Sequence, residues 1–111
     1  NADSARRLVE ALRAQFPETA WTVVLGVAHG KDIGGIVREF AVLPARFVLT
    51  NPRPPKPSGL EELAAAAAAA GLRYEVVPQI RSAADLPGGE PLLFTGSFFT
   101  ALIGDELFSE R

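Results

Sequence analysis

Apolar residues recur along this 111-residue chain in two patterns that alternate with each other. Apolar positions three and four residues apart predict helices, and continuous apolar runs predict strands that are buried on both faces. The helical spacing occurs at Ala5, Leu8, Val9, Leu12 and Phe16 and again at Ile33, Ile36, Val37 and Phe40. We expect Asp3 or Ser4 to cap the first helix, because either side chain can accept a backbone N–H.

Strands are predicted over residues 21–27, 46–50, 73–77 and 91–95. Further helices are predicted over 60–70, before Gly71, over 81–86, and over 98–108. Strands joined through helices run parallel, with right-handed crossovers. The predicted fold class is therefore α/β: a three-layer, Rossmann-like domain with a mostly parallel sheet and helices on both faces.

Proline dominates the connector after the second strand. Residues 51–57 read Asn-Pro-Arg-Pro-Pro-Lys-Pro, and we expect them to run extended along the surface because proline fixes φ and lacks a backbone donor. Ser58 and Glu61 have the spacing of a capping box, which predicts the start of the next helix. The run of alanines in that helix favours helix formation and allows close packing on the sheet.

Composition limits the classes of function. Residues 1–111 are 48% apolar and 22% charged, which is ordinary for a single folded domain. The formal net charge of −2 gives no reason to expect a nucleic acid or an acidic membrane as partner. The lack of cysteine, of a signal-peptide pattern and of a long apolar stretch predicts a cytoplasmic protein. With His29 as the single histidine, the chain offers no His/Cys metal cluster and no Cys–His nucleophile.

The start of the chain predicts a fragment of a longer polypeptide. There is no methionine, so Asn1 is not a native start, and the chain opens directly into a helix. Arginine far outnumbers lysine and alanine is abundant, which indicates a GC-rich bacterial genome. Because no strand precedes the first helix, we expect the sheet to have an exposed edge at which two copies of the chain could pair.

Two strand-to-helix junctions carry candidate chemistry. At the later junction, Ser97 follows a glycine and opens a helix, where its hydroxyl and nearby N–H groups could bind a carboxylate or simply cap the helix. At the earlier junction, residues 26–35 lack the glycine spacing and the magnesium-binding hydroxyl of a Walker loop. There Asp32 either caps the next helix or faces a substrate cleft with Lys31, and His29 is either solvated or functional.

Four segments, in chain order, resemble one known family. They are Asn1 to Ala5 (Asn-Ala-Asp-Ser-Ala), Gly26-x-x-x-Gly-Lys-Asp-x-x-Gly, Thr50 to Pro54 (Thr-Asn-Pro-Arg-Pro) and Phe94 to Ser97 (Phe-Thr-Gly-Ser). Together they resemble the carboxyl-terminal domain of the folylpolyglutamate synthase/dihydrofolate synthase family, within the Mur ligase superfamily. The resemblance covers essentially the whole chain and implies that residues 1–111 are one such domain from a larger enzyme.

The resemblance implies a ligase of folate biosynthesis and one-carbon metabolism. Such an enzyme uses ATP and Mg²⁺ to phosphorylate a carboxylate of a folate or pteroate, and the amine of L-glutamate then attacks the acyl phosphate. Most ATP and Mg²⁺ ligands lie in its own amino-terminal ATPase domain. The carboxyl-terminal domain helps to hold glutamate and nucleotide, and its closure orients the reactants and excludes water. The chain alone is therefore expected to be inactive, and no catalytic residue is assigned to it.

The resemblance also implies site residues. Ser97 matches the family serine associated with glutamate. Asn1 matches the asparagine of an Asp-Gly-Ala-His-Asn-Pro motif, with alanine here in place of the proline, and is expected to face nucleotide and glutamate. Lys31 and Asp32 match a loop that commonly reads Asp-Lys-Asp, with glycine here in place of the first aspartate. Together with His29, they are expected to face the nucleotide or the substrate.

Two other functions are compatible with the residues themselves. One is a stand-alone module that binds a small molecule or nucleotide without catalysis. The other is a docking domain whose proline-rich connector packs against a partner. The coding sequence upstream of Asn1 distinguishes these from the ligase, since the ligase requires an Asp-Gly-Ala-His segment there and a Walker loop further upstream.

Overall fold

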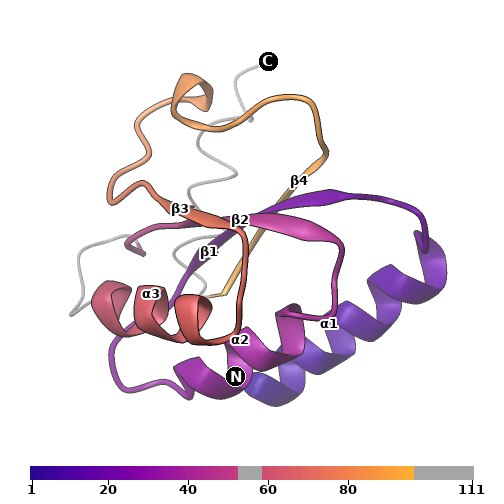
Figure 1. Ribbon diagram of the computed structural model, residues 1–111, viewed down its shortest axis with the longest axis horizontal. Helices are drawn as coiled ribbons and strands as arrows, with labels where there is room; N and C mark the ends of the chain where they lie inside the picture. Colours follow the sequence, from indigo (N-terminus) through magenta and orange to yellow (C-terminus); the bar gives the residue numbers. More distant parts are fainter. Residues whose placement is uncertain (53–58, 97–111) are drawn as a thin grey trace.

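The computed structural model describes residues 1–52 and 59–96. Its elements (Figure 1) are α1 (Ala2–Gln15), β1 (Trp21–Gly26), α2 (Ile33–Phe40), β2 (Ala45–Leu49), α3 (Leu60–Ala69), β3 (Tyr74–Val76), the 3₁₀ helix η1 (Ala83–Asp85) and β4 (Leu92–Gly96). All four predicted strands are confirmed to within one residue at each end. The helix predicted over 98–108, the connector residues 53–57 and Ser58 lie outside the described residues.

The four strands form one parallel sheet in the order β3-β2-β1-β4. β1 lies between β2 and β4, in a register that sets Leu25 beside Leu49 on one side and Thr95 on the other. Val23, Val24 and Leu25 are completely buried, as an uninterrupted apolar run predicts for a strand covered on both faces. The predicted parallel α/β fold is thus confirmed.

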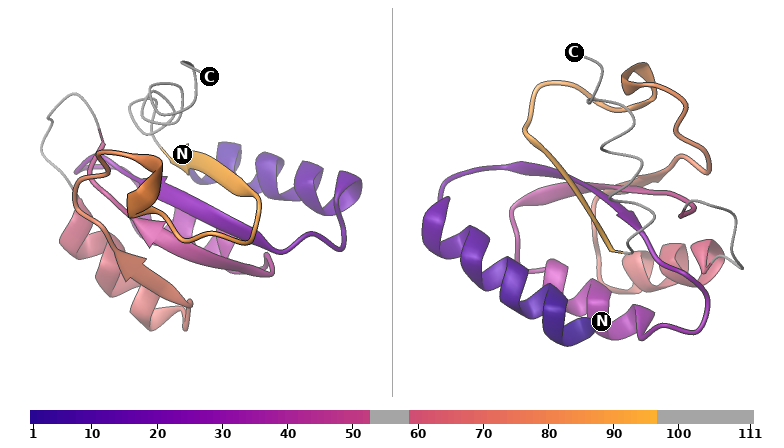
Figure 2. Two further views of the ribbon diagram at one scale, coloured as in Figure 1. Left: turned by 90° about the horizontal axis from the view of Figure 1, so that it is seen from above. Right: turned by 180° about the vertical axis from the view of Figure 1, so that it is seen from behind.

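The three α-helices lie together on one face of the sheet, and the connection from β3 to β4 crosses the other face (Figures 1 and 2). The helical face holds the larger core, whose buried members include Ala5, Val9 and Leu12 of α1, Ile33, Ile36, Val37 and Phe40 of α2, Leu63 and Ala67 of α3, and Val23, Leu25, Phe47 and Leu49 of the sheet. A smaller core of Val24, Val48 and Ile80 lies on the second face.

The handedness of the crossovers explains this division. The chain passes from β1 to β2 to β3 in one direction, so right-handed crossovers place α2 and α3 on the same face. It then returns in the opposite direction to β4, and a right-handed connection must therefore cross the second face. Among the described residues, the helix on that face is η1, a single turn in place of the helix predicted over 81–86. A capping box between Ser82 and Asp85 closes this turn within three residues.

Two helix caps differ from the sequence prediction. α1 is capped by Asn1, whose Oδ1 accepts the backbone N–H of Ser4 at 2.8 Å, so Asp3 and Ser4 both lie inside the helix. The asparagine side chain provides the first acceptor in the chain, and the helix therefore starts earlier than expected. α3 begins after Gly59, which makes no side-chain cap bond. A Cβ at Gly59 would lie 2.5 Å from Cδ1 of Ile33, so a larger residue here would require the end of the Ile33 side chain to shift.

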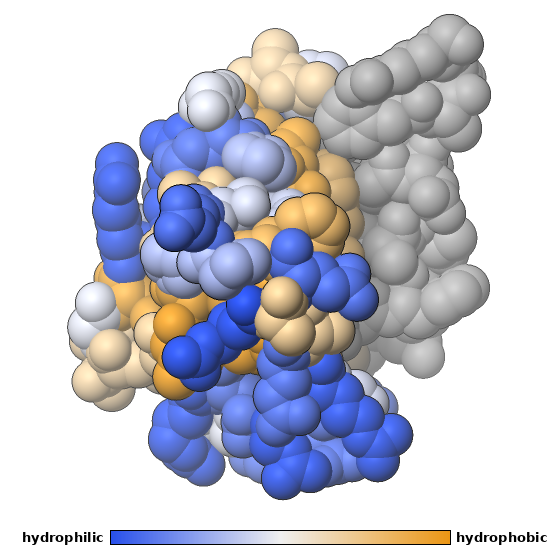
Figure 3. Space-filling model, turned by 90° about the vertical axis from the view of Figure 1, so that its right-hand side faces the viewer, coloured by the Kyte–Doolittle hydropathy of each residue, from blue (hydrophilic) through white to orange (hydrophobic). Residues whose placement is uncertain are grey.

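Other local features match their sequence patterns. The lower part of the face in Figure 3, where α1 lies, is largely hydrophilic. Asp3 of α1 forms ion pairs with Arg6 and Arg7. Asp32 caps α2, as one of the two alternatives for this residue predicted. Gly71 follows α3 with a φ of +72°, the left-handed conformation that favours glycine after a helix.

Arg46 of β2 ties the sheet to the connection on the second face. Its Nε donates to Oγ1 of the buried Thr22 at 3.2 Å, and its Nη2 donates to the carbonyl of Gly88 at 2.6 Å. The same Nε lies 3.2 Å from Oε1 of Glu90. Because Glu90 lies two residues before the start of β4, these contacts hold the chain close to the point where β4 begins.

Candidate functional site

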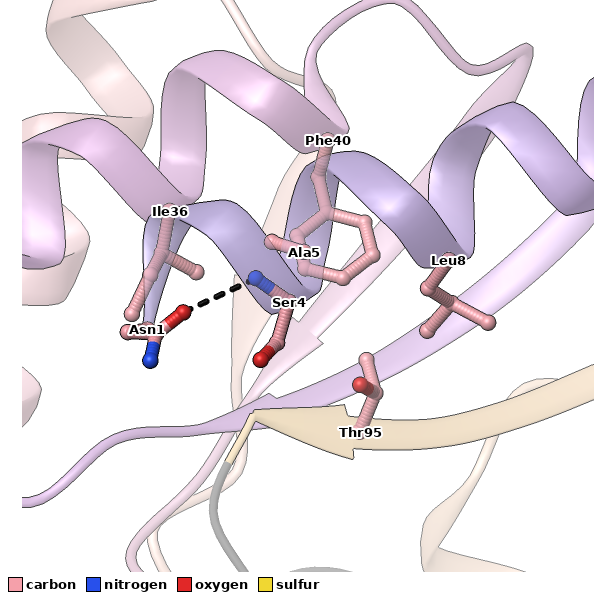
Figure 4. A pocket seen from close by; sticks show the side chains of 7 residues that line it. All are labelled: Asn1, Ser4, Ala5, Leu8, Ile36, Phe40 and Thr95. Atoms are coloured by element: carbon pink, nitrogen blue, oxygen red, sulfur yellow. Dashed lines mark hydrogen bonds between the residues drawn. The ribbon is translucent and has the colours of Figure 1, made fainter.

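The carboxyl ends of the parallel strands meet at one edge of the sheet, where the strand order changes direction between β1 and β4. From β1 the chain continues through α2 to β2, on the side away from β4. Loops that diverge in this way leave a crevice, and ligands of open parallel sheets usually bind in it. The amino end of α1 also lies at this edge (Figure 4), and its unpaired N–H groups favour an anion nearby.

A cavity of about 130 Å³ opens beside the end of β4 (Figure 4). Its lining consists of Asn1, Ser4, Ala5 and Leu8 of the first helix and its cap, Ile36 and Phe40 of α2, and Thr95 of β4. The amide nitrogen of Asn1 and the hydroxyl of Ser4 both turn toward the end of β4 (Figure 4). A few polar groups above an apolar wall are typical of a site for a small polar group such as a carboxylate.

Asn1 is the predicted site residue that the structure places at this cavity. Its side-chain oxygen accepts the N–H of Ser4, so the amide nitrogen is the atom that can donate to a ligand. Ser97, the first choice for a glutamate contact, lies outside the described residues. It follows Gly96, the last residue of β4, directly in the sequence, and its role stays a prediction.

The loop after β1 carries the other three predicted residues. His29, Lys31 and Asp32 are exposed, and none of them lines the cavity. Oδ1 of Asp32 accepts the backbone N–H of Gly35 at 3.1 Å, which confirms that Asp32 caps α2. A Cβ at Gly35 would lie only 2.8 Å from Cγ of Asp32, so the cap depends on glycine at this position. A substrate contact of Lys31 stays a prediction.

His29 lines a second, more open hollow of about 450 Å³, together with Asn51 and the first turn of α3. The backbone N–H of Gly59 donates to the carbonyl of Val27 at 3.2 Å and so holds the start of α3 against the loop after β1. Asn1 and His29 therefore border two different hollows of the same sheet edge.

The charged groups of the described residues do not assemble a metal site. Within residues 1–52 and 59–96, no three His, Cys, Asp or Glu side chains lie close enough together to hold a metal ion. Asp85 has a lowered pKa, because its carboxylate accepts the backbone N–H groups of Arg81 and Ser82. These bonds belong to η1 on the second face, so they stabilise a turn. In the same part of the chain, no helix has the length and apolar character needed to cross a membrane.

Ser4 and Thr95 are lining residues that the sequence reasoning missed. The sequence marks Ser4 only as a candidate cap and Thr95 only as part of the Phe-Thr-Gly-Ser segment. A usable signal exists for Thr95, since it is the polar residue at the end of an otherwise apolar run of strand character. Their proximity itself depends on the packing of α1 beside β4, two elements at opposite ends of the described chain.

Comparison with known proteins places the fold. No family model and no curated protein sequence matches the chain. Two solved structures match it over 100% of its length: a folylpolyglutamate synthase from Thermotoga maritima (TM-score 0.84, 21% identity) and a folylpolyglutamate synthetase from Helicobacter pylori (TM-score 0.78, 19% identity). The chain spans 26% and 28% of the length of these two proteins. The chain therefore has the same fold as a segment that makes up about a quarter of each of these two proteins. The fold expected from the family resemblance is confirmed.

Proposed function

We propose that this chain is the carboxyl-terminal domain of a cytoplasmic, ATP-dependent ligase that joins L-glutamate to a carboxylate of a folate or pteroate. Its part in the reaction is to bind glutamate and to close over the enzyme's own amino-terminal ATPase domain. The proposal is supported by the fold shared with two folylpolyglutamate synthases and by the ordered sequence segments that resemble this family.

The cavity beside the end of β4 is the observation that carries the proposal. Its polar groups are the amide of Asn1 and the hydroxyls of Ser4 and Thr95, which can donate hydrogen bonds to a carboxylate. The wall behind them consists of Ala5, Leu8, Ile36 and Phe40, and less polar surroundings strengthen such bonds. Ser97 follows β4 directly in the sequence, so a glutamate carboxylate held at this edge is within the region that the family resemblance assigns to glutamate.

ATP and Mg²⁺ are assigned to the separate ATPase domain. The described residues do not group three candidate metal ligands, and the loop over residues 26–35 departs from a Walker loop in spacing and in its missing hydroxyl. Residues 1–52 and 59–96 thus offer no complete ATP–magnesium site, and the role proposed for this chain is glutamate binding and exclusion of water from the acyl phosphate. We accordingly expect no ATP turnover by the 111-residue chain alone.

Steady-state kinetics of the full-length ligase test the proposal. Replacing Ser97 by alanine should raise the KM for L-glutamate by about tenfold, the loss of roughly one hydrogen bond to a charged group, and should leave the KM for ATP nearly unchanged. Ser82→Ala on the second face is the matched control and should change neither value. Unaltered glutamate kinetics in Ser97→Ala would remove Ser97 from the site, and ATP turnover by the purified chain would contradict the division of labour.

A binding module without catalysis is the alternative. NMR titration of the 111-residue chain with L-glutamate and, separately, with ATP distinguishes the two. If the chain is the ligase domain, L-glutamate should change the amide chemical shifts of Ser4 and Thr95, and D-glutamate should change them less. Shifts confined to ATP, in the hollow that His29 lines, would favour the nucleotide-binding module.

A further inference from the structure

β3 lies at one margin of the sheet and exposes all three of its residues. Within the described residues its one strand neighbour is β2 (Figure 2). Tyr74 is 36% exposed and Val76 is 43% exposed, although both belong to a strand of an otherwise well-buried sheet. Edge strands with exposed apolar side chains are templates for pairing with another strand unless charges prevent it.

The pairing of β3 with β2 determines where its side chains point. Tyr74 and Val76 pair with Phe47 and Leu49, which belong to the core under the helices. Glu75 pairs with Val48, which belongs to the smaller core on the second face. Because side chains alternate along a strand, Arg73 shares the second face with Glu75, and the two apolar residues lie on the helical face.

The same pairing determines which backbone groups remain for another strand. Phe47 donates its N–H to the carbonyl of Arg73 at 2.9 Å, and Val77 donates to the carbonyl of Leu49 at 2.9 Å. In a parallel pair, alternate residues bond to the same neighbour, so the odd-numbered residues of this segment serve β2. The N–H and C=O of Tyr74 therefore point away from the sheet, as do those of Val76.

We propose that β3 pairs with β3 of a second copy of this chain, antiparallel, with Tyr74 opposite Tyr74 about a two-fold axis. The two Tyr74 residues then form a hydrogen-bonded pair, in which the backbone N–H of each donates to the backbone carbonyl of the other. This arrangement is isologous, closes at two copies, and continues the sheet from one copy into the other.

Charge complementarity favours this register and favours a second copy of the chain as the partner. With Tyr74 opposite itself, Arg73 of each copy lies opposite Glu75 of the other, and the contact repeats twice by symmetry. Shifting the register so that Tyr74 lies opposite Val76 would instead set the two Glu75 carboxylates against each other. Within the described residues neither Arg73 nor Glu75 forms an ion pair, although both line a shallow hollow together with a second cation, Arg46. An acidic partner for Arg73 is thus provided by the second copy.

Sedimentation equilibrium of the 111-residue chain tests the pairing. A short edge buries little surface, so we expect a weak, reversible dimer that forms at roughly 0.1 to 1 mM. Arg73→Glu and Glu75→Arg should each weaken the dimer by about tenfold or more, because each places two like-charged pairs across the axis. The double variant Arg73→Glu/Glu75→Arg should restore the dimer. Arg13→Glu, an exposed charge reversal on α1, is the matched control and should leave the dimer unchanged.

Mixing the two single variants gives the sharpest result. A copy with glutamate at both positions is complementary to a copy with arginine at both, so the mixture should form a heterodimer although neither variant dimerises alone. The pairing would be refuted by a chain that remains monomeric at roughly 1 mM, by a dimer insensitive to both single variants, or by variants that fail to associate when mixed. Circular dichroism confirms that each exposed substitution leaves the fold intact.

Discussion

The cap of α2 allows a quantitative test of the loop after β1, because Asp32 and Gly35 depend on each other. Oδ1 of Asp32 accepts the N–H of Gly35 at 3.1 Å, and a Cβ on Gly35 would lie 2.8 Å from Cγ of the same side chain. The three atoms nearest to that Cβ all belong to Asp32, so alanine at position 35 displaces the Asp32 side chain first. The test replaces both residues by alanine, singly and together.

The expected magnitudes follow from two opposing effects. Loss of the cap in Asp32→Ala should lower the free energy of unfolding by about 1 kcal/mol. Gly35→Ala gains up to about 1 kcal/mol from helix propensity but displaces the Asp32 carboxylate and loses the cap, so its net effect should be close to zero. In the Asp32→Ala background no carboxylate is displaced, and Gly35→Ala should then stabilise by about 1 kcal/mol.

Urea unfolding of the four chains, followed by circular dichroism, measures this coupling. The double-mutant cycle should give an interaction energy of about 1 kcal/mol between the two sites. Asp32→Asn is the matched control, since asparagine caps nearly as well as aspartate and should leave the stability nearly unchanged. If Gly35→Ala has the same effect with and without Asp32, the side chain at position 32 is not held at the helix start, and the cap interpretation is wrong.

Two further predictions concern the second face. Arg46→Met should lower the free energy of unfolding by about 1–3 kcal/mol, because the bonds to Thr22 and Gly88 are lost with the ion pair. Glu90→Gln should lower it by less than about 1 kcal/mol, because it removes the ion pair alone. If the two variants lost equal free energy in urea unfolding, the Gly88 bond would contribute nothing to stability. Asp85→Asn should lower the melting temperature at pH 7, since a carboxyl whose pKa is lowered from 3.8 stabilises the fold above that pH. The difference should disappear as the pH falls through the folded-state pKa, and a difference that persists in acid would contradict it.

The candidate site shows where sequence reasoning stops. The strand ends and helix starts could be located from local patterns, and they correctly indicated one edge of a parallel sheet. The capping role of Asp32 could also be predicted from the sequence, since its partner lies only three residues away. That Asn1 and His29 line two different hollows could not be predicted from the sequence, because it depends on how α1 and α3 pack on either side of α2.

The sequence by itself determined the four strands, the helices α1, α2 and α3, and the parallel class of the sheet, because periodicity records which face of each element is apolar. It did not determine that β4 lies beside β1, or that Arg46 reaches the turn before β4. Those features join residues far apart in the chain, and right-handed crossovers and core packing decide them together. The cavity between Asn1, Ser4 and Thr95 exists for the same reason: each residue has its place from local sequence, and only the packing of α1 beside β4 brings the three together.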